Sequence, residues 1–183
     1  MSAVHSQSVQ FPKNILMEKW FEIGFFWQGN LAISEMPRLC QQVDKALQQA
    51  QCPEFELTCR LFKQDNIVRI CYDVVGVVHL HCHRCLMPMS IDISGRYPVA
   101  LLQNAEEINQ LEEDAPYVLL EELGGDGRWL PLLDLLEDEL ILALPLSAHH
   151  ADCDMPVEFV EEVIEEPKEN PFAVLAALKN TPS

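Results

Sequence analysis

Four strand-like segments follow one another between residues 54 and 123, and no helix-length pattern separates them. Branched and aromatic side chains are frequent in each segment, as they are in β-strands. The tetrapeptide KQDN at residues 63–66 fits a hairpin turn between the first two. Parallel neighbours would need a long crossover connection, usually a helix. The sequence therefore predicts an antiparallel meander, with strands at 54–62, 67–82, 90–102 and 115–123.

Helical patterns flank the predicted sheet. A further strand is expected at residues 21–33, after which Ser34 is placed to cap a helix over 34–50. Pro131 opens a second helix over 131–144, with an apolar sector that we expect to face the sheet. The predicted fold class is α+β, a mostly antiparallel sheet flanked by helices.

The C-terminal part differs in composition from the rest. We expect an α+β domain over residues 1–156, then an acidic linker and a C-terminal helix over 157–183. Asn170 and Pro171 suit the cap and the first position of this short helix. The predicted architecture is thus one domain with an acidic arm that ends in a helix.

Charge is distributed unevenly along the chain. The net charge is −17, and residues 106–169 hold 20 of the 29 acidic residues and only two basic ones. A surface of this sign repels phosphates, so RNA contact is expected only locally, within residues 60–96, and a basic protein partner suits the acidic half. The seven cysteines, the absence of a signal-peptide pattern and the lack of a long apolar run predict a cytoplasmic protein with no membrane contact.

The stretch HLHCHRCLMP at residues 79–88 offers two metal hypotheses. On a strand, His79, His81 and His83 share one face, but the outer two Cα atoms would be about 13 Å apart, too far for one zinc ion to take all three. The second hypothesis is a structural zinc site, because two half-motifs have the same spacing. Its ligands would be Cys82, Cys85, His150 and Cys153. Otherwise, Cys82 is a core residue and Cys85 a turn residue.

A carboxylate lies in the apolar sector of the helix at 131–144. The helical period places Glu139 between leucines, whereas Asp134, Glu137 and Asp138 fall on the opposite, solvated face. A buried carboxylate needs a partner. We expect Arg84 or Arg96 to pair with Glu139, unless Glu139 reaches solvent at the sector's edge.

Catalytic signatures are missing from the sequence. It contains no Gly-x-Ser-x-Gly elbow, no Walker motif and no His-Glu-x-x-His motif. We therefore expect neither catalytic residues nor a small-molecule substrate. No cofactor is expected to be required, and the structural zinc ion remains a hypothesis.

Three blocks together resemble the YceD family of bacteria and plastids, the large ribosomal RNA subunit accumulation proteins. They are HCHRCL at 81–86, LPLLDLLEDELILALPLSAHHADC at 130–153 and NPFAVLAALK at 170–179. The family's Cys-x-Arg-Cys motif is matched by Cys82, Arg84 and Cys85, and its later cysteine by Cys153. The histidines at 79, 81 and 83 have no counterpart in that pattern.

The resemblance implies a non-enzymatic factor in the synthesis, processing or stability of 23S rRNA, and so in large ribosomal subunit biogenesis. The expected partners are a large-subunit precursor, its 23S rRNA, or a basic ribosomal or processing protein. The alternatives are an acidic chaperone for a basic ribosomal protein without RNA contact, and a metal-dependent nuclease. The expected partner-binding residues are Arg69, Arg84, Arg96, Phe172, Leu175 and Leu178. The last three could instead dock on the chain's own core.

Overall fold

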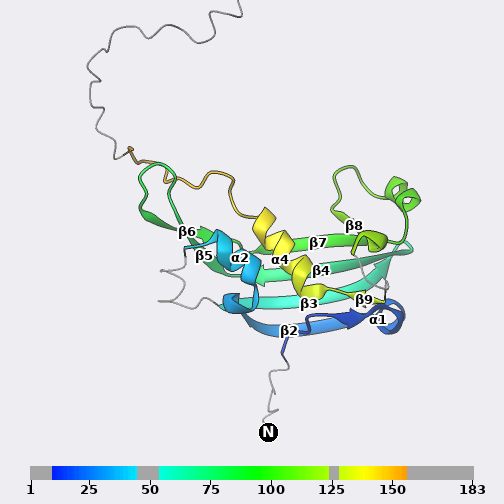
Figure 1. The fold of residues 1–183 in the computed structure, drawn as a ribbon. Coiled ribbons are helices and arrows are strands. Elements are labelled where there is room, and N and C mark those ends of the chain that lie inside the picture. Colours follow the sequence, from blue (N-terminus) through cyan, green and yellow to red (C-terminus); the bar gives the residue numbers. More distant parts are fainter. Residues whose placement is uncertain (1–9, 45–53, 124–127, 156–183) are drawn as a thin grey trace, which may run out of the picture.

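A five-stranded sheet is the centre of the fold in the computed structural model, which describes residues 10–44, 54–123 and 128–155 (Figure 1). Its order is β2-β3-β4-β7-β8, and every pair except the last is antiparallel. The strands are β2 (Phe25–Ala32), β3 (Glu54–Gln64), β4 (Ile67–Val75), β7 (Gly95–Leu102) and β8 (Tyr117–Leu119). The α+β class and the mostly antiparallel sheet are confirmed.

The predicted hairpin turn is present, but the predicted meander is wrong at its last strand. Asp65 and Asn66 both have positive φ, 50° and 67°, as a two-residue hairpin turn requires. By contrast, β8 runs parallel to β7. The 3-10 helix η2 (Ala105–Gln110) lies in the connection between β7 and β8, which brings the chain back so that both strands run in the same direction. A second 3-10 helix, η3 (Leu120–Leu123), follows β8.

Gly76 divides the strand that the sequence predicts over 67–82. A Cβ atom at Gly76 would lie 2.1 Å from the Phe55 ring, so this position excludes larger residues. Beyond it, β5 (Val77–His81) leaves the main sheet and pairs with β6 (Pro88–Asp92) in a two-stranded sheet. The segment that carries the Cys-x-x-Cys motif therefore projects from one end of the fold.

The N-terminal region differs from the prediction. Residues 17–23 form helix α1 (Met17–Ile23), which ends at Gly24 with φ 75°, and the strand begins only after it. The expected helix over 34–50 is replaced by the 3-10 helix η1 (Ile33–Glu35) and by α2 (Pro37–Gln42), and residues 45–50 lie outside the described ones. Ser34 is not the cap, because Met36 occupies that position and offers no side-chain acceptor.

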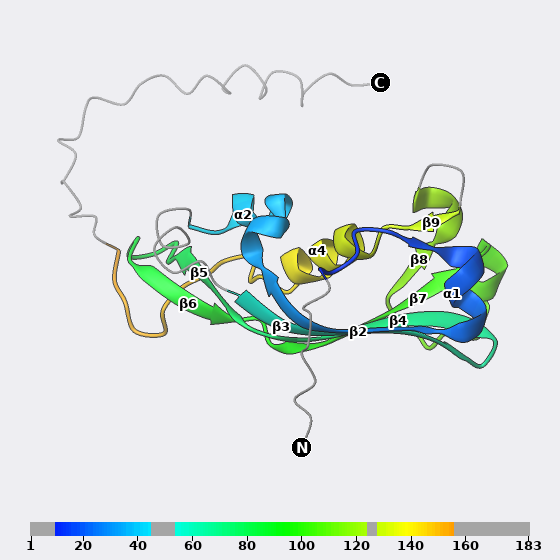
Figure 2. The same ribbon diagram turned by 90° about the horizontal axis from the view of Figure 1, so that it is seen from below.

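Helices α2 and α4 (Leu132–Leu142) cover one face of the main sheet, and α1 lies at the end of β2 (Figure 2). A short sheet of β1 (Ile15–Leu16) and β9 (Trp129–Leu130) leads into α4. The Tyr72 hydroxyl donates to the Leu132 carbonyl at 2.9 Å and joins the sheet to this helix. The core between them includes Leu31, Phe55, Leu57, Ile70, Leu135, Leu136 and Leu140.

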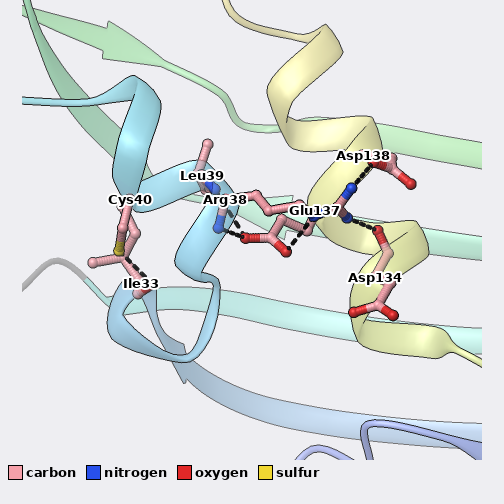
Figure 3. Close-up of polar contacts among 7 residues, drawn as sticks. All are labelled: Ile33, Arg38, Leu39, Cys40, Asp134, Glu137 and Asp138. Atoms are coloured by element: carbon pink, nitrogen blue, oxygen red, sulfur yellow. Dashed lines mark hydrogen bonds and ion pairs between the residues drawn. The ribbon is translucent and has the colours of Figure 1, made fainter.

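The polar contacts of α4 correct the sequence reading. Glu137, expected in solvent, has a side chain only 2% exposed and forms an ion pair with Arg38 Nε at 3.0 Å (Figure 3). Glu139 is half-buried, and neither Arg84 nor Arg96 pairs with it. Leu142, expected in the apolar sector, is 78% exposed.

The acidic arm and C-terminal helix expected over 157–183 lie outside the described residues. Within the described ranges, no helix is long and apolar enough to cross a bilayer.

Candidate metal centre

The structure brings the four predicted metal ligands together. The Sγ atoms of Cys82, Cys85 and Cys153 and a ring nitrogen of His150 all lie within 4.8 Å of one another. Cys82 Sγ is 3.6 Å from Cys153 Sγ, and Cys85 Sγ is 3.3 Å from His150 Nδ1. Ligands on a tetrahedral zinc ion with Zn–S bonds of about 2.3 Å would be roughly 3.8 Å apart, so the separations fit that ion.

Two backbone segments position this cluster. The first is the turn between β5 and β6, closed by hydrogen bonds from Cys82 N to Met87 O and from Leu86 N to Cys82 O, each 2.9 Å. The second is the segment after α4, held by a bond from His83 N to Ala148 O at 2.7 Å. The cluster therefore joins two parts of the chain that are more than 60 residues apart in sequence.

Backbone N–H groups point at Cys82 Sγ. Those of Arg84, Cys85 and His150 donate to this sulfur, each at 3.4 Å. Burial raises the pKa of Cys82, but these hydrogen bonds outweigh burial and lower its pKa to about 5. A sulfur held as thiolate is the form that binds a metal ion.

Cys153 has the opposite tendency. Burial, with the neighbouring Cys82 and Cys85, raises the pKa of Cys153 to about 11. Several sulfur atoms this close repel one another when all are charged, and a divalent cation removes that repulsion. The donor set, three cysteines and one histidine, is one that structural zinc sites use.

The three alternating histidines do not converge. His79 Nδ1 lies 3.2 Å from Ser90 Oγ, and His81 Nε2 lies 3.1 Å from the Asp44 carboxylate. Among the residues that the structure describes, the Cys₃His cluster is the one group of three or more potential ligands close enough to share an ion. A His-x-His-x-His zinc centre is therefore not supported by the geometry.

The arginines expected at binding sites lie in two places. Arg84 Nη1 donates to the Cys153 carbonyl at 3.1 Å, so this arginine braces the cluster and does not reach Glu139. Arg96 and Arg69 lie on the main sheet, where Arg96 Nε donates to Asp73 Oδ1 at 2.9 Å. No sequence pattern indicated two further polar contacts, the Arg38–Glu137 ion pair and the approach of His81 to Asp44.

Comparison with known proteins identifies the family. A sequence model described as "Large ribosomal RNA subunit accumulation protein YceD" matches residues 70–179. The chain belongs to the YceD family. It is 29% identical over 180 residues to the large ribosomal RNA subunit accumulation protein YceD of Haemophilus influenzae, and the alignment covers 94% of this chain and 98% of that protein. No solved structure matches the chain.

The YceD match includes both halves of the Cys₃His cluster and helix α4. It begins within β4, so β2 and β3 precede the family-model match.

Proposed function

We propose that this chain is a non-enzymatic factor that supports the synthesis, processing or stability of 23S rRNA, and thereby large ribosomal subunit biogenesis. One observation carries the proposal: the chain aligns over nearly its full length with a protein named for large ribosomal RNA subunit accumulation.

The Cys₃His cluster serves structure in this proposal. A zinc ion bound by Cys82, Cys85, His150 and Cys153 would have four protein ligands and no open position. Catalytic zinc keeps a position for water or substrate. The ligand set therefore argues against a metal-dependent nuclease at this centre and favours a zinc ion that fixes the β5–β6 turn to the segment after α4.

The chain then acts through binding surfaces. Its acidic stretch over 106–169 suits a basic ribosomal or processing protein, and the arginines Arg69, Arg84 and Arg96 suit RNA phosphates. Phe172, Leu175 and Leu178, outside the described residues, have the spacing of helix-in-groove anchors. The partner would be a large-subunit precursor, met through its 23S rRNA or one of its basic proteins.

The test is deletion of the gene in its host, with 23S and 16S rRNA quantified against each other. The proposal expects less 23S rRNA relative to 16S rRNA, and recovery when the full chain is supplied. An unchanged ratio would refute it, as would cleavage of precursor RNA by the purified protein with divalent metal.

A second candidate, the acidic chaperone, is favoured by the same run of carboxylates. This candidate would be supported if the chain captures a basic ribosomal protein, the capture survives RNase treatment, and the chain itself binds no RNA. Loss of the captured material on RNase treatment would select an RNA-dependent contact instead.

A further inference from the structure

Within the described residues, one face of the main sheet carries no α-helix. Helices α2 and α4 both lie on the opposite side (Figure 2), and the 3-10 helix η2 packs against this side at one end of the sheet, where Ile108 lies against Ile67, Ala100 and Leu102. Alternating residues of β3 show the difference, since Phe55, Leu57, Cys59 and Leu61 are buried under the helices while their neighbours in sequence are more exposed. We call the uncovered side the open face.

The strand register sets aromatic and cationic side chains beside one another on the open face. Phe26 of β2 lies opposite Arg60 of β3, and Phe62 of β3 lies opposite Arg69 of β4. Directly opposed side chains on a sheet have Cβ atoms about 5 Å apart. Arg96 of β7 lies opposite Asp73 of β4, on the same face. Two phenylalanines and three arginines thus form one contiguous patch.

Both phenylalanines are accessible. Phe26 is 64% and Phe62 40% exposed, although aromatic rings of this size are usually buried. They border a hollow of about 530 Å³ next to Arg60. The hollow is lined by Ile23, Gly24, Phe25, Phe26, Arg60, Leu61 and Phe62.

The charge of the patch opposes that of the chain. Of the charged residues in the patch, three are arginines and one is a carboxylate, Asp73, which accepts from Arg60 and Arg96; the patch has an excess of two positive charges, while Glu54 and Glu56 lie on the same face toward the other end of β3 and the chain has a net charge of −17. Burial raises the pKa of Asp73, but the hydrogen bonds from Arg96 and Arg60 outweigh it and hold that pKa below its usual range. Arg69 Nε is buried and makes no hydrogen bond with any residue that the structure describes.

We propose that the open face binds single-stranded RNA, with bases stacked on Phe26 and Phe62 and phosphates held by Arg60, Arg69 and Arg96. Exposed aromatics beside cations on a surface are the chemistry with which proteins hold unpaired nucleotides. Base pairs inside an A-form duplex cannot present their faces to such rings. A second copy docked through the same face is a poor occupant, because its own arginines would meet these. The inference rests on the proposed function and names the ligand of the arginine surface.

The experiment is fluorescence anisotropy of the full-length protein with an end-labelled, mixed-sequence single-stranded RNA of about 12 nucleotides. We expect Phe26→Ala and Phe62→Ala each to weaken binding about tenfold, as the loss of one stacked base does. Arg69→Gln should lower the slope of log Kd against log salt by about 0.7, the contribution of one phosphate contact in a single strand. The same sequence as a duplex should bind more weakly.

Matched controls lie on the helix side of the molecule. Trp129→Ala removes an aromatic ring that is 54% exposed, and Lys13→Gln removes an exposed cation. Both should leave Kd within about twofold. Thermal midpoints of all five variants show whether any loss of binding is a loss of folding.

Several outcomes would overturn the inference. They are no RNA binding, equal losses in the control variants, tighter binding of a polyglutamate peptide, and a dimer that Phe26→Ala abolishes in a protein that binds no RNA. Failure of this inference can be told apart from failure of the proposed function. If the protein binds no RNA but deletion of its gene still lowers 23S rRNA, this inference alone is overturned. If the protein binds RNA but deletion of its gene leaves 23S rRNA unchanged, the proposed function alone is overturned.

Discussion

At the residue scale, Glu137 of α4 accepts hydrogen bonds from the backbone N–H groups of Arg38 and Leu39, the second and third residues of α2. These donors have no partner within a helix, and a cap residue normally satisfies them. Met36, at the cap position, offers no such acceptor. A carboxylate from one helix thus caps another (Figure 3).

Replacing Glu137 with alanine tests this role. It would leave two backbone donors and the Arg38 guanidinium without their acceptor, so we expect the free energy of unfolding to fall by about 3 kcal/mol. Asp138 also pairs with Arg38 but is 51% exposed, and Asp138→Ala should cost under about 1 kcal/mol. Urea unfolding of both variants measures the difference, and equal losses would contradict the capping role.

Replacing Glu139 should stabilise the fold, in contrast to replacing Glu137. Burial, and then the nearby Asp138, raise the pKa of Glu139, so the folded chain holds this proton more tightly than the unfolded chain does. Stability is therefore lost as pH rises from the unfolded toward the folded pKa. Glu139→Gln should raise the thermal midpoint by roughly 1–2 °C at neutral pH and leave it unchanged below about pH 4.

The exposed Glu113 provides the control, since Glu113→Gln should leave the thermal midpoint unchanged both at neutral pH and below about pH 4. A lower thermal midpoint for Glu139→Gln at neutral pH would mean that this carboxylate has a cationic partner in solution.

A helical wheel could predict that Glu139 lies among leucines but not that Glu137 is buried. The wheel describes one helix facing one sheet, whereas Glu137 is covered by α2, which packs on another side of α4.

At the element scale, Gly76 marks the point where β4 ends and β5 turns into the second sheet. A methyl group there would lie 2.1 Å from Phe55, a buried core residue. We expect Gly76→Ala to lower the free energy of unfolding by about 1–3 kcal/mol, the usual cost of overpacking. At Gly95 the nearest atom is 3.4 Å from such a methyl group, so Gly95→Ala should cost less than Gly76→Ala in the same unfolding measurement. The reverse order would contradict this account.

The Cys₃His cluster joins the β5–β6 turn to the segment after α4. We expect one zinc ion per full-length chain by native mass spectrometry, and chelation should lower the thermal midpoint by roughly 5 °C or more. Cys85→Ser and Cys153→Ser should abolish zinc binding. Cys40→Ser, at a cysteine outside the cluster, should retain it. A purified protein that contains no zinc, and whose thermal midpoint chelation leaves unchanged, would disprove the site.

The sequence predicts the ligand cluster better than the strand layout for a physical reason. Ligand spacing within each half-motif is local, and a tetrahedral ion requires two such halves to meet. The parallel pairing of β8 and the division at Gly76 depend on contacts between distant residues, such as Gly76 with Phe55. Local propensity carries no information on those contacts.

At the scale of the whole molecule, an acidic stretch and a local cluster of arginines belong to one chain. The acidic residues concentrate in 106–169, and the open face carries Arg60, Arg69 and Arg96. The sequence alone predicts this asymmetry and the family, because both depend on composition and motif order. It does not show that Phe26 and Phe62 share a face with these arginines, since the predicted strand over 21–33 has no register until β2 pairs with β3.

We propose that the chain works by binding large-subunit precursors. Sucrose-gradient fractionation of a host lysate, with the protein detected in each fraction, measures this binding. We expect the protein to sediment with particles lighter than the mature large subunit, and RNase treatment to return it to the top of the gradient. Protein found only at the top of the gradient before RNase treatment would refute binding to these precursors.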